Sequence, residues 1–107
     1  MTILAIPNFG KRISPRIDYA ENLNIITVES KKVIKKESIK ILVHSYLERI
    51  NLIIRIKPDI VICDGISDLT FNKLKENNIK VIPWIHGKVD EVVKDYLNNN
   101  LETKKIN

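Results

Sequence analysis

Apolar residues fall into two kinds of pattern along this chain, and the change between them separates strands from helices. Residues 2–6, 59–63 and 79–82 are nearly continuous apolar runs, the pattern of strands buried on both faces of a sheet. Residues 23–28 and 33–43 are two further extended segments, joined by a turn at "ESKK". The pattern therefore predicts five strands, with the first one central in the sheet.

Apolar residues at three-to-four spacing predict three helices between and after these strands. The first is capped by Ser45, turns Leu47 inward and stops at Pro58, the second begins at Ser67, and the third begins at about residue 88. The remaining residues expected to face the core are Ile50, Ile53 or Ile54, Phe71, Leu74, Val89, Val92, Val93, Tyr96 and Leu97.

This order of elements predicts an α/β fold: a single domain over residues 1–107 with a five-stranded mixed sheet flanked by about three helices. Residues 99–107 have no apolar period and are expected to form a frayed tail. Right-handed crossovers place the three apolar strands side by side and parallel. Their carboxyl ends then meet at one edge, where open α/β sheets usually bind ligands.

Three segments that are distant in sequence meet at that edge. They are the long loop 7–20, the turn 63–67 and the loop 83–87. Arg12, Arg16 and Lys11 in the long loop could hold an anion there, helped by the free backbone N–H groups at the start of the second helix. A solvated surface loop explains the same three residues equally well.

The chain carries 18 Lys and Arg against 13 Asp and Glu, a net charge of +5. Only 6% of its residues are aromatic and available to stack on bases, so we do not expect nucleic-acid binding. The Lys-rich stretch "KKVIKKESIK" could bind phosphate, but lysines that protect an exposed edge strand are the simpler interpretation.

No apolar run approaches the roughly 20 residues of a membrane-spanning helix, so no membrane association is expected. The one cysteine, Cys63, cannot form an internal disulfide. A lone thiol agrees with a reducing compartment, and we expect the protein in the cytoplasm.

Cys63 and His86 are the candidate metal ligands, because they end neighbouring predicted strands and both suit transition metals or metal-sulfur clusters. Each has a simpler explanation, Cys63 as a small buried hydrophobic residue and His86 as a loop residue. No CxxC, HxxxH or HExxH spacing occurs in the chain. No catalytic or nucleotide-binding motif is present either, so we do not expect an enzyme.

The segments "ILAIP", "RISPRIDYA", "PDIVICDGISDLTFNKLKENNIKVIP" and "GKVDEVVKDYLNNNLE" together resemble the dinitrogenase iron-molybdenum cofactor biosynthesis family. The resemblance covers nearly the whole chain. It implies a ribonuclease H-like fold without nuclease activity, and binding or carriage of an anionic iron-sulfur or molybdenum-containing cluster at the strand edge. The cofactor-binding candidates that follow are Arg12, Ser14, Arg16, Asp64, Gly65 and Ser67.

The chain departs from the family pattern at three places. Arg16 stands where the loop usually has a histidine, the turn that begins at Asp64 keeps only Gly65 of its glycines, and Asn100 replaces a glycine. Two hypotheses follow. The first is a non-enzymatic carrier of a metal-sulfur cluster that works with cluster-assembly proteins. The alternative is a cluster-free interaction or regulatory domain that binds a partner protein or forms a homodimer.

Overall fold

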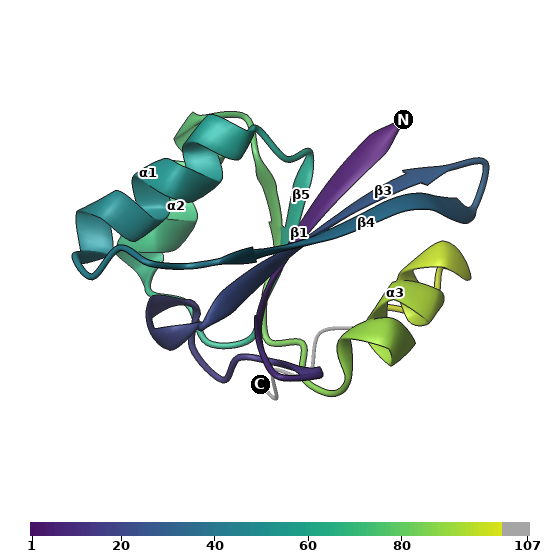
Figure 1. Cartoon of the computed structure of the whole chain (residues 1–107). Helices are drawn as coiled ribbons and strands as arrows, with labels where there is room; N and C mark the ends of the chain where they lie inside the picture. The colour runs from purple at the N-terminus through teal and green to yellow at the C-terminus, as the bar shows by residue number, and fades with distance from the viewer. Residues whose placement is uncertain (102–107) are drawn as a thin grey trace.

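The computed structural model describes residues 1–101. Residues 102–107 of the predicted tail 99–107 lie outside the described residues. The chain forms a sheet flanked by helices (Figure 1). The strands are β1 (Thr2–Phe9), β2 (Arg12–Ile13), β3 (Asn22–Glu29), β4 (Lys32–Lys40), β5 (Ile60–Ile62) and β6 (Lys80–Ile82). The helices are the short 3-10 turn η1 (Ile17–Tyr19), α1 (Tyr46–Ile56), α2 (Asp68–Glu76) and α3 (Val89–Leu97).

The sheet is mixed, with the order β4-β3-β1-β5-β6 and β2 paired with the far end of β1. β1 runs parallel to β5 and antiparallel to β3, and β5 runs parallel to β6. This confirms the predicted α/β class, the central place of the first strand and the row of three parallel strands. The sixth strand, β2, has two residues and was not expected.

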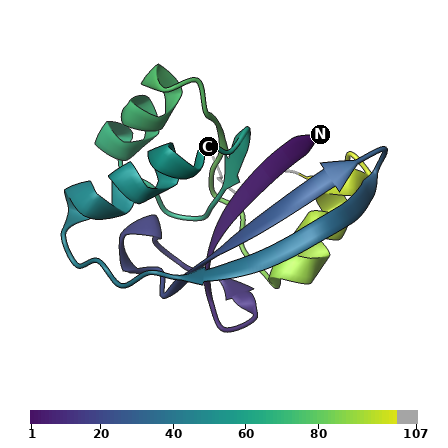
Figure 2. The ribbon, with the colours of Figure 1, turned by 45° about the horizontal axis from the view of Figure 1, so that its top comes forward.

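Each face of the sheet carries its own helical layer, with α1 and α2 on one face and α3 on the other (Figures 1 and 2). The alternation of side chains along each strand produces the two layers. Along β1, Leu4 and Ile6 pack with the α3 residues, whereas Ala5 packs with α1 and α2. In β5, Ile62 joins the α3 layer, while Val61 joins the other.

Two parts of the predicted pattern are wrong. The segment 7–20 is not a loop throughout, because β1 continues to Phe9 and pairs there with β2 and β3. Leu47 was expected to face the core, but it is 52% exposed. The buried core contacts of α1 come from Ile50 and Ile53, and in its first turn Tyr46, not Leu47, packs against the same cluster.

The turns and caps follow the sequence signals more closely. The "ESKK" turn is present between β3 and β4, with Ser30 and Lys31 both at positive φ, as a two-residue hairpin turn requires. The side chain of Ser45 accepts a hydrogen bond from the backbone N–H of Glu48, as predicted. β4 is an edge strand and almost all of it is exposed, again as predicted.

Candidate functional site

Backbone hydrogen bonds join the three segments that follow β1, β5 and β6. The N–H of Ile13 donates to Gly87 O at 2.9 Å. The N–H of Gly65 donates to Pro15 O at 2.8 Å, and the N–H of Ile17 donates to Gly65 O at 3.1 Å. The three segments are therefore one connected surface at the carboxyl edge of the parallel strands, where the topology predicted them to meet.

Gly65 lies where two of these segments come closest. A Cβ built on Gly65 would come within 2.7 Å of the carbonyl oxygen of Pro15, closer than real Cβ atoms approach. Arg16 and Gly65 form a parallel bridge at the same place. The absence of a side chain at Gly65 is thus required for packing of the loop, independently of any ligand.

The two serine candidates also make internal contacts. Ser14 is only 1% exposed, and its hydroxyl donates to the carbonyl of Arg16 at 2.7 Å. Ser67 caps α2, because its Oγ accepts the backbone N–H of Thr70 and lies 3.0 Å from the Thr70 hydroxyl. Both side chains brace the surface from within and do not point to a ligand.

The two arginine candidates are exposed. Arg12 makes no ion pair with any of the residues described. Arg16 pairs with Asp18 at 3.0 Å and lies over the ring of Tyr19, at 5.7 Å from its centroid. Asp18 therefore balances part of the Arg16 charge, while the Arg12 charge is available to an anion.

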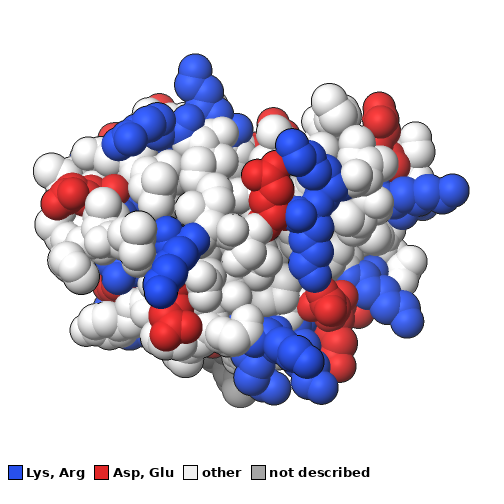
Figure 3. Space-filling model, viewed as in Figure 1, with Lys and Arg blue, Asp and Glu red and all other residues white. Residues whose placement is uncertain are grey.

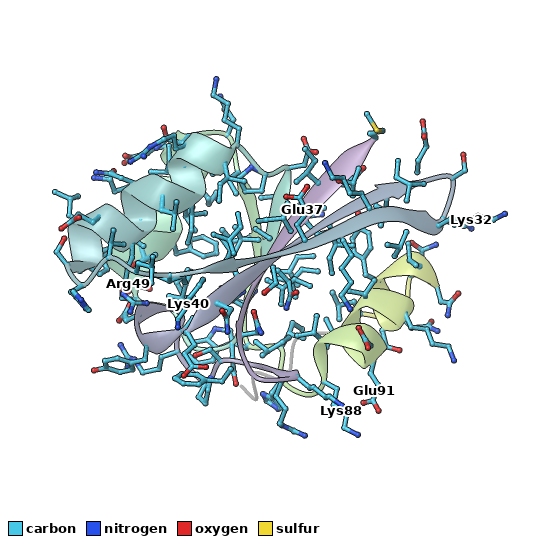
Figure 4. All side chains as sticks on the ribbon, viewed as in Figure 1. Lys32, Glu37, Lys40, Arg49, Lys88 and Glu91 are labelled. Carbon is cyan, nitrogen blue, oxygen red and sulfur yellow. The ribbon has the colours of Figure 1, made fainter. Side chains whose placement is uncertain are left out.

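Arg49 adds a cation at the border of this surface that the sequence did not single out. It extends from α1 toward η1 (Figure 4), and its Nη1 donates to the carbonyl of Ala20 at 2.8 Å. The contact ties the first half of α1 to the end of the loop. Arg49 thus fixes the loop that carries Arg16.

His86 and Asp64 face each other across the surface. His86 Nδ1 lies 3.3 Å from Asp64 Oδ2, with the imidazole 56% exposed and the carboxylate 18% exposed. A carboxylate that holds one ring nitrogen orients the imidazole and directs the other nitrogen, Nε2, elsewhere. This is the usual arrangement around a metal-binding histidine, although it also occurs in ordinary surface pairs.

The side chain of Cys63, which directly follows β5, points away from that surface and into the core. It is fully buried in the apolar cluster beneath α1 and α2. Burial raises the pKa of the Cys63 thiol to about 12, with the charge of Asp64 as the smaller cause. A neutral, enclosed thiol is a poor metal ligand, so the position favours the simpler interpretation of Cys63 as a core residue.

The donor set decides what kind of metal species fits this surface. Within residues 1–101 no group of three or more His, Cys, Asp or Glu side chains converges in a way that could hold a metal ion. A closed site built from protein ligands therefore does not fit the residues present. Charge and hydrogen bonds around a preformed anionic cluster, with His86 as a single ligand, do fit them.

Charge is mixed over the rest of the molecule. On the face shown in Figure 3, one short row of Lys and Arg side chains runs beside acidic groups, and the other basic side chains are separated by uncharged and acidic groups. A nucleic-acid backbone would find no cationic track across the whole of that face. None of the described helices combines the length and apolar character needed to cross a bilayer.

The fold and the site geometry together define a class of protein: an α/β domain with a surface suited to ligand binding at the carboxyl ends of its parallel strands. A model of the family described as dinitrogenase iron-molybdenum cofactor matches residues 1–99, so the chain belongs to that family. This confirms the resemblance seen in the sequence. No curated protein matches the chain.

Solved structures share the fold. The crystal structure of PH0822 is 18% identical, with a TM-score of 0.90, and covers 96% of this chain and 95% of that one. The NMR structure of a Thermotoga protein is 22% identical, with a TM-score of 0.75 and coverage of 96% and 93%. The apo form of the orange protein from Desulfovibrio gigas is 14% identical, with a TM-score of 0.77 and coverage of 96% and 92%. At these identities the likeness establishes the fold and not the ligand.

Proposed function

We propose that this chain is a non-enzymatic carrier domain for an anionic metal-sulfur cluster of the iron-molybdenum cofactor type, acting in the cytoplasm. Family membership supports the kind of cargo. One structural observation supports the manner of binding: Arg12 in β2 and Arg16 after it are exposed on a segment that backbone hydrogen bonds attach to the strand edge. The cluster is cargo that is received and passed on, so tight covalent ligation is not required.

Each residue of the surface has a distinct part in this proposal. Arg12 supplies the uncompensated positive charge. Arg16 adds a second positive charge when the cluster replaces Asp18 as the partner of the Arg16 guanidinium. His86 contributes Nε2 as the one soft ligand, oriented by Asp64 through Nδ1. Cys63 takes no part, because its thiol is buried and protonated.

Anaerobic reconstitution with iron, molybdate and sulfide, followed by metal analysis of the desalted protein, tests the proposal. The wild-type chain should retain metal, and an Arg12→Gln Arg16→Gln double variant should lose most of it. His86→Ala should weaken retention, whereas Cys63→Ala should leave it unchanged. Failure of the wild-type chain to retain any metal would exclude the carrier function.

A matched control separates the site from net charge. Arg55 is exposed in the last turn of α1, at the opposite end of that helix from the loops, and Arg55→Gln removes one charge without touching the surface. If Arg55→Gln lowers metal retention as much as Arg12→Gln alone, the cluster is held by overall charge and not by this surface.

A second candidate function is binding of a partner protein by a cluster-free domain, and exposed apolar side chains favour it. Tyr19 on η1 is 67% exposed, and Leu69 in the first turn of α2 is 68% exposed. Leu47, in the first turn of α1, is similarly exposed. A hydrogen bond between the Tyr46 and Thr70 hydroxyls joins this turn to the first turn of α2. Exposed apolar side chains that lie together on a surface are typical of interaction sites.

Sedimentation of the purified chain, together with affinity capture from cell extract, tests the second function. It predicts a homodimer or a stable complex that a Tyr19→Ser Leu69→Ser variant does not form. A monomer that captures no partner would count against it.

A further inference from the structure

Polar residues lie side by side on three neighbouring strands of the α3 face, and those on β1 and β3 are buried while the one on β4 is exposed. In β1, Asn8 follows Leu4 and Ile6 in the alternation that points toward α3, and in β3, Asn24 precedes Ile26 in the same way. Register places Asn24 between Ile6 of β1 and Ser38 of β4. Asn8 is 4% exposed and Asn24 is 8% exposed. Polar side chains at positions where the pattern calls for apolar ones are expected at functional sites.

The amide of Asn8 is only half satisfied. Its Nδ2 donates to the carbonyl of Gly10 at 2.8 Å, and because a carbonyl can only accept, this bond fixes which end of the amide is the oxygen. The Oδ1 atom is buried and has no hydrogen-bond partner among the residues described. An unpaired buried acceptor destabilises the fold, and a ligand that donates a hydrogen bond would relieve that cost.

A cavity of about 340 Å³ opens beside this polar row. Its lining includes Asn8, Asn24, Ser38, Lys11, Lys36 and Asp90. The volume lies at the small end of the range for small-molecule sites and far exceeds that of one water molecule. Most of the lining residues are polar or charged, with Val89 as the apolar side chain among them, so the cavity suits a small hydrophilic compound.

The charge in the cavity favours an anion. Lys11 and Lys36 face one carboxylate, Asp90, which pairs with Lys36 at 2.7 Å. The first turn of α3 lies here, its N-cap residue Lys88 gives no side-chain cap, and Figure 4 shows the Lys88 and Glu91 side chains directed away from the sheet. The N–H of Val89 already donates to the carbonyl of Lys11 at 2.9 Å, so the start of the helix adds the N–H groups that follow Val89 and the positive end of the dipole.

We propose that this cavity binds a small hydroxylated phosphate monoester. The phosphate lies against Lys11 and the first turn of α3, while ligand hydroxyls donate to Asn8 Oδ1 and bond the Asn24 amide and the Ser38 hydroxyl. The exposed Lys36–Asp90 pair opens to admit the ligand and closes beside it. This site lies on the α3 face and does not depend on the cluster-carrier function.

Titration of the isotope-labelled full chain with glycerol 3-phosphate, followed by NMR, tests the proposal. The side-chain amides of Asn8 and Asn24 and the backbone amide of Asp90 should shift along one saturable curve. Glycerol and inorganic phosphate, tested separately, should each bind at least about tenfold more weakly, since each lacks half of the contacts. Lys11→Gln should weaken binding of glycerol 3-phosphate by about tenfold, the usual effect of losing a charge-assisted hydrogen bond.

Two variants make the outcome decisive. Lys32 lies on β4, like Ser38, but at the β3–β4 turn and away from the cavity (Figure 4). Lys32→Gln removes the same charge as Lys11→Gln and should leave the affinity unchanged. Asn8→Val should abolish binding, and if that variant does not fold, the Lys11 and Lys32 comparison stands alone. Absence of shifts at the two asparagines overturns the proposal. Equal affinities for inorganic phosphate and glycerol 3-phosphate, or equal effects of the two lysine variants, would reduce it to an adventitious ion only.

Discussion

The main chain at Gly65 lies so close to Pro15 that a Cβ on Gly65 would come within 2.7 Å of the Pro15 carbonyl oxygen. A Gly65→Ala substitution must therefore push the loop away from the turn. We expect it to lower the free energy of unfolding by about 1–3 kcal/mol, the usual cost of overpacking. Chemical denaturation measures the loss. Amide exchange should also accelerate at Ile17, whose N–H bonds to Gly65 O.

Gly10 provides the comparison for this substitution. Gly10 has a positive φ of 54° but nothing within 4 Å of a built Cβ. Gly10→Ala should therefore cost only the backbone strain, about 1 kcal/mol, and should leave the exchange of Ile17 unchanged. Equal exchange at Ile17 in both variants would contradict the close packing of Gly65 against Pro15.

The strand edge could be predicted because it depends on chain order and on local apolar periodicity. Three apolar runs separated by helices must lie parallel, and their following loops must then meet. The packing of Leu47 could not be predicted in the same way. Helical spacing identifies an apolar face, but only the position of α1 over the sheet decides that Ile50 and Ile53 are covered and Leu47 is not.

The roles of the candidate site residues were harder to predict than their position. Cys63 and His86 do follow neighbouring strands, but strand alternation turns the Cys63 side chain into the core. The bonds of Ser14 and Ser67 to backbone atoms are likewise tertiary facts that a motif does not contain. The sequence does not single out Asn8, because its pattern predicts a loop from Pro7 onward, although Asn8 alternates with Leu4 and Ile6.

Cys63 should make stability depend on pH in the alkaline range. Its folded-state pKa of about 12 lies above the ordinary value of 9.0, so the unfolded thiol ionises first as pH rises. The contribution of the thiol to stability is full below pH 9 and is lost progressively as pH rises toward about 12. The difference in unfolding free energy between wild type and Cys63→Ala should shrink over that range. A constant difference would show that the thiol is not desolvated.

The pair formed by Lys36 and Asp90 should be visible in the titration of Asp90. A hydrogen bond from Lys36 and its charge hold the pKa of Asp90 below the ordinary 3.8. Carboxyl-carbon NMR should detect this, and Lys36→Gln should return the pKa toward 3.8, whereas Lys32→Gln should not. Stabilisation by the pair is present above pH 3.8 and disappears at more acidic pH. Because both groups are exposed, its effect on unfolding should stay below about 1 kcal/mol.

Ser67 should behave as a helix cap and not as a ligand-binding group. Its Oγ accepts the N–H of Thr70, as the Oγ of Ser45 accepts the N–H of Glu48 at the start of α1. Ser67→Ala and Ser45→Ala should therefore each lower the free energy of unfolding by about 1 kcal/mol. Ser45 serves as the control, since it caps the other helix and was not a site candidate. If Ser67→Ala alone abolishes metal retention in the reconstitution assay while both variants stay folded, Ser67 contacts the cluster and its role is more than a cap.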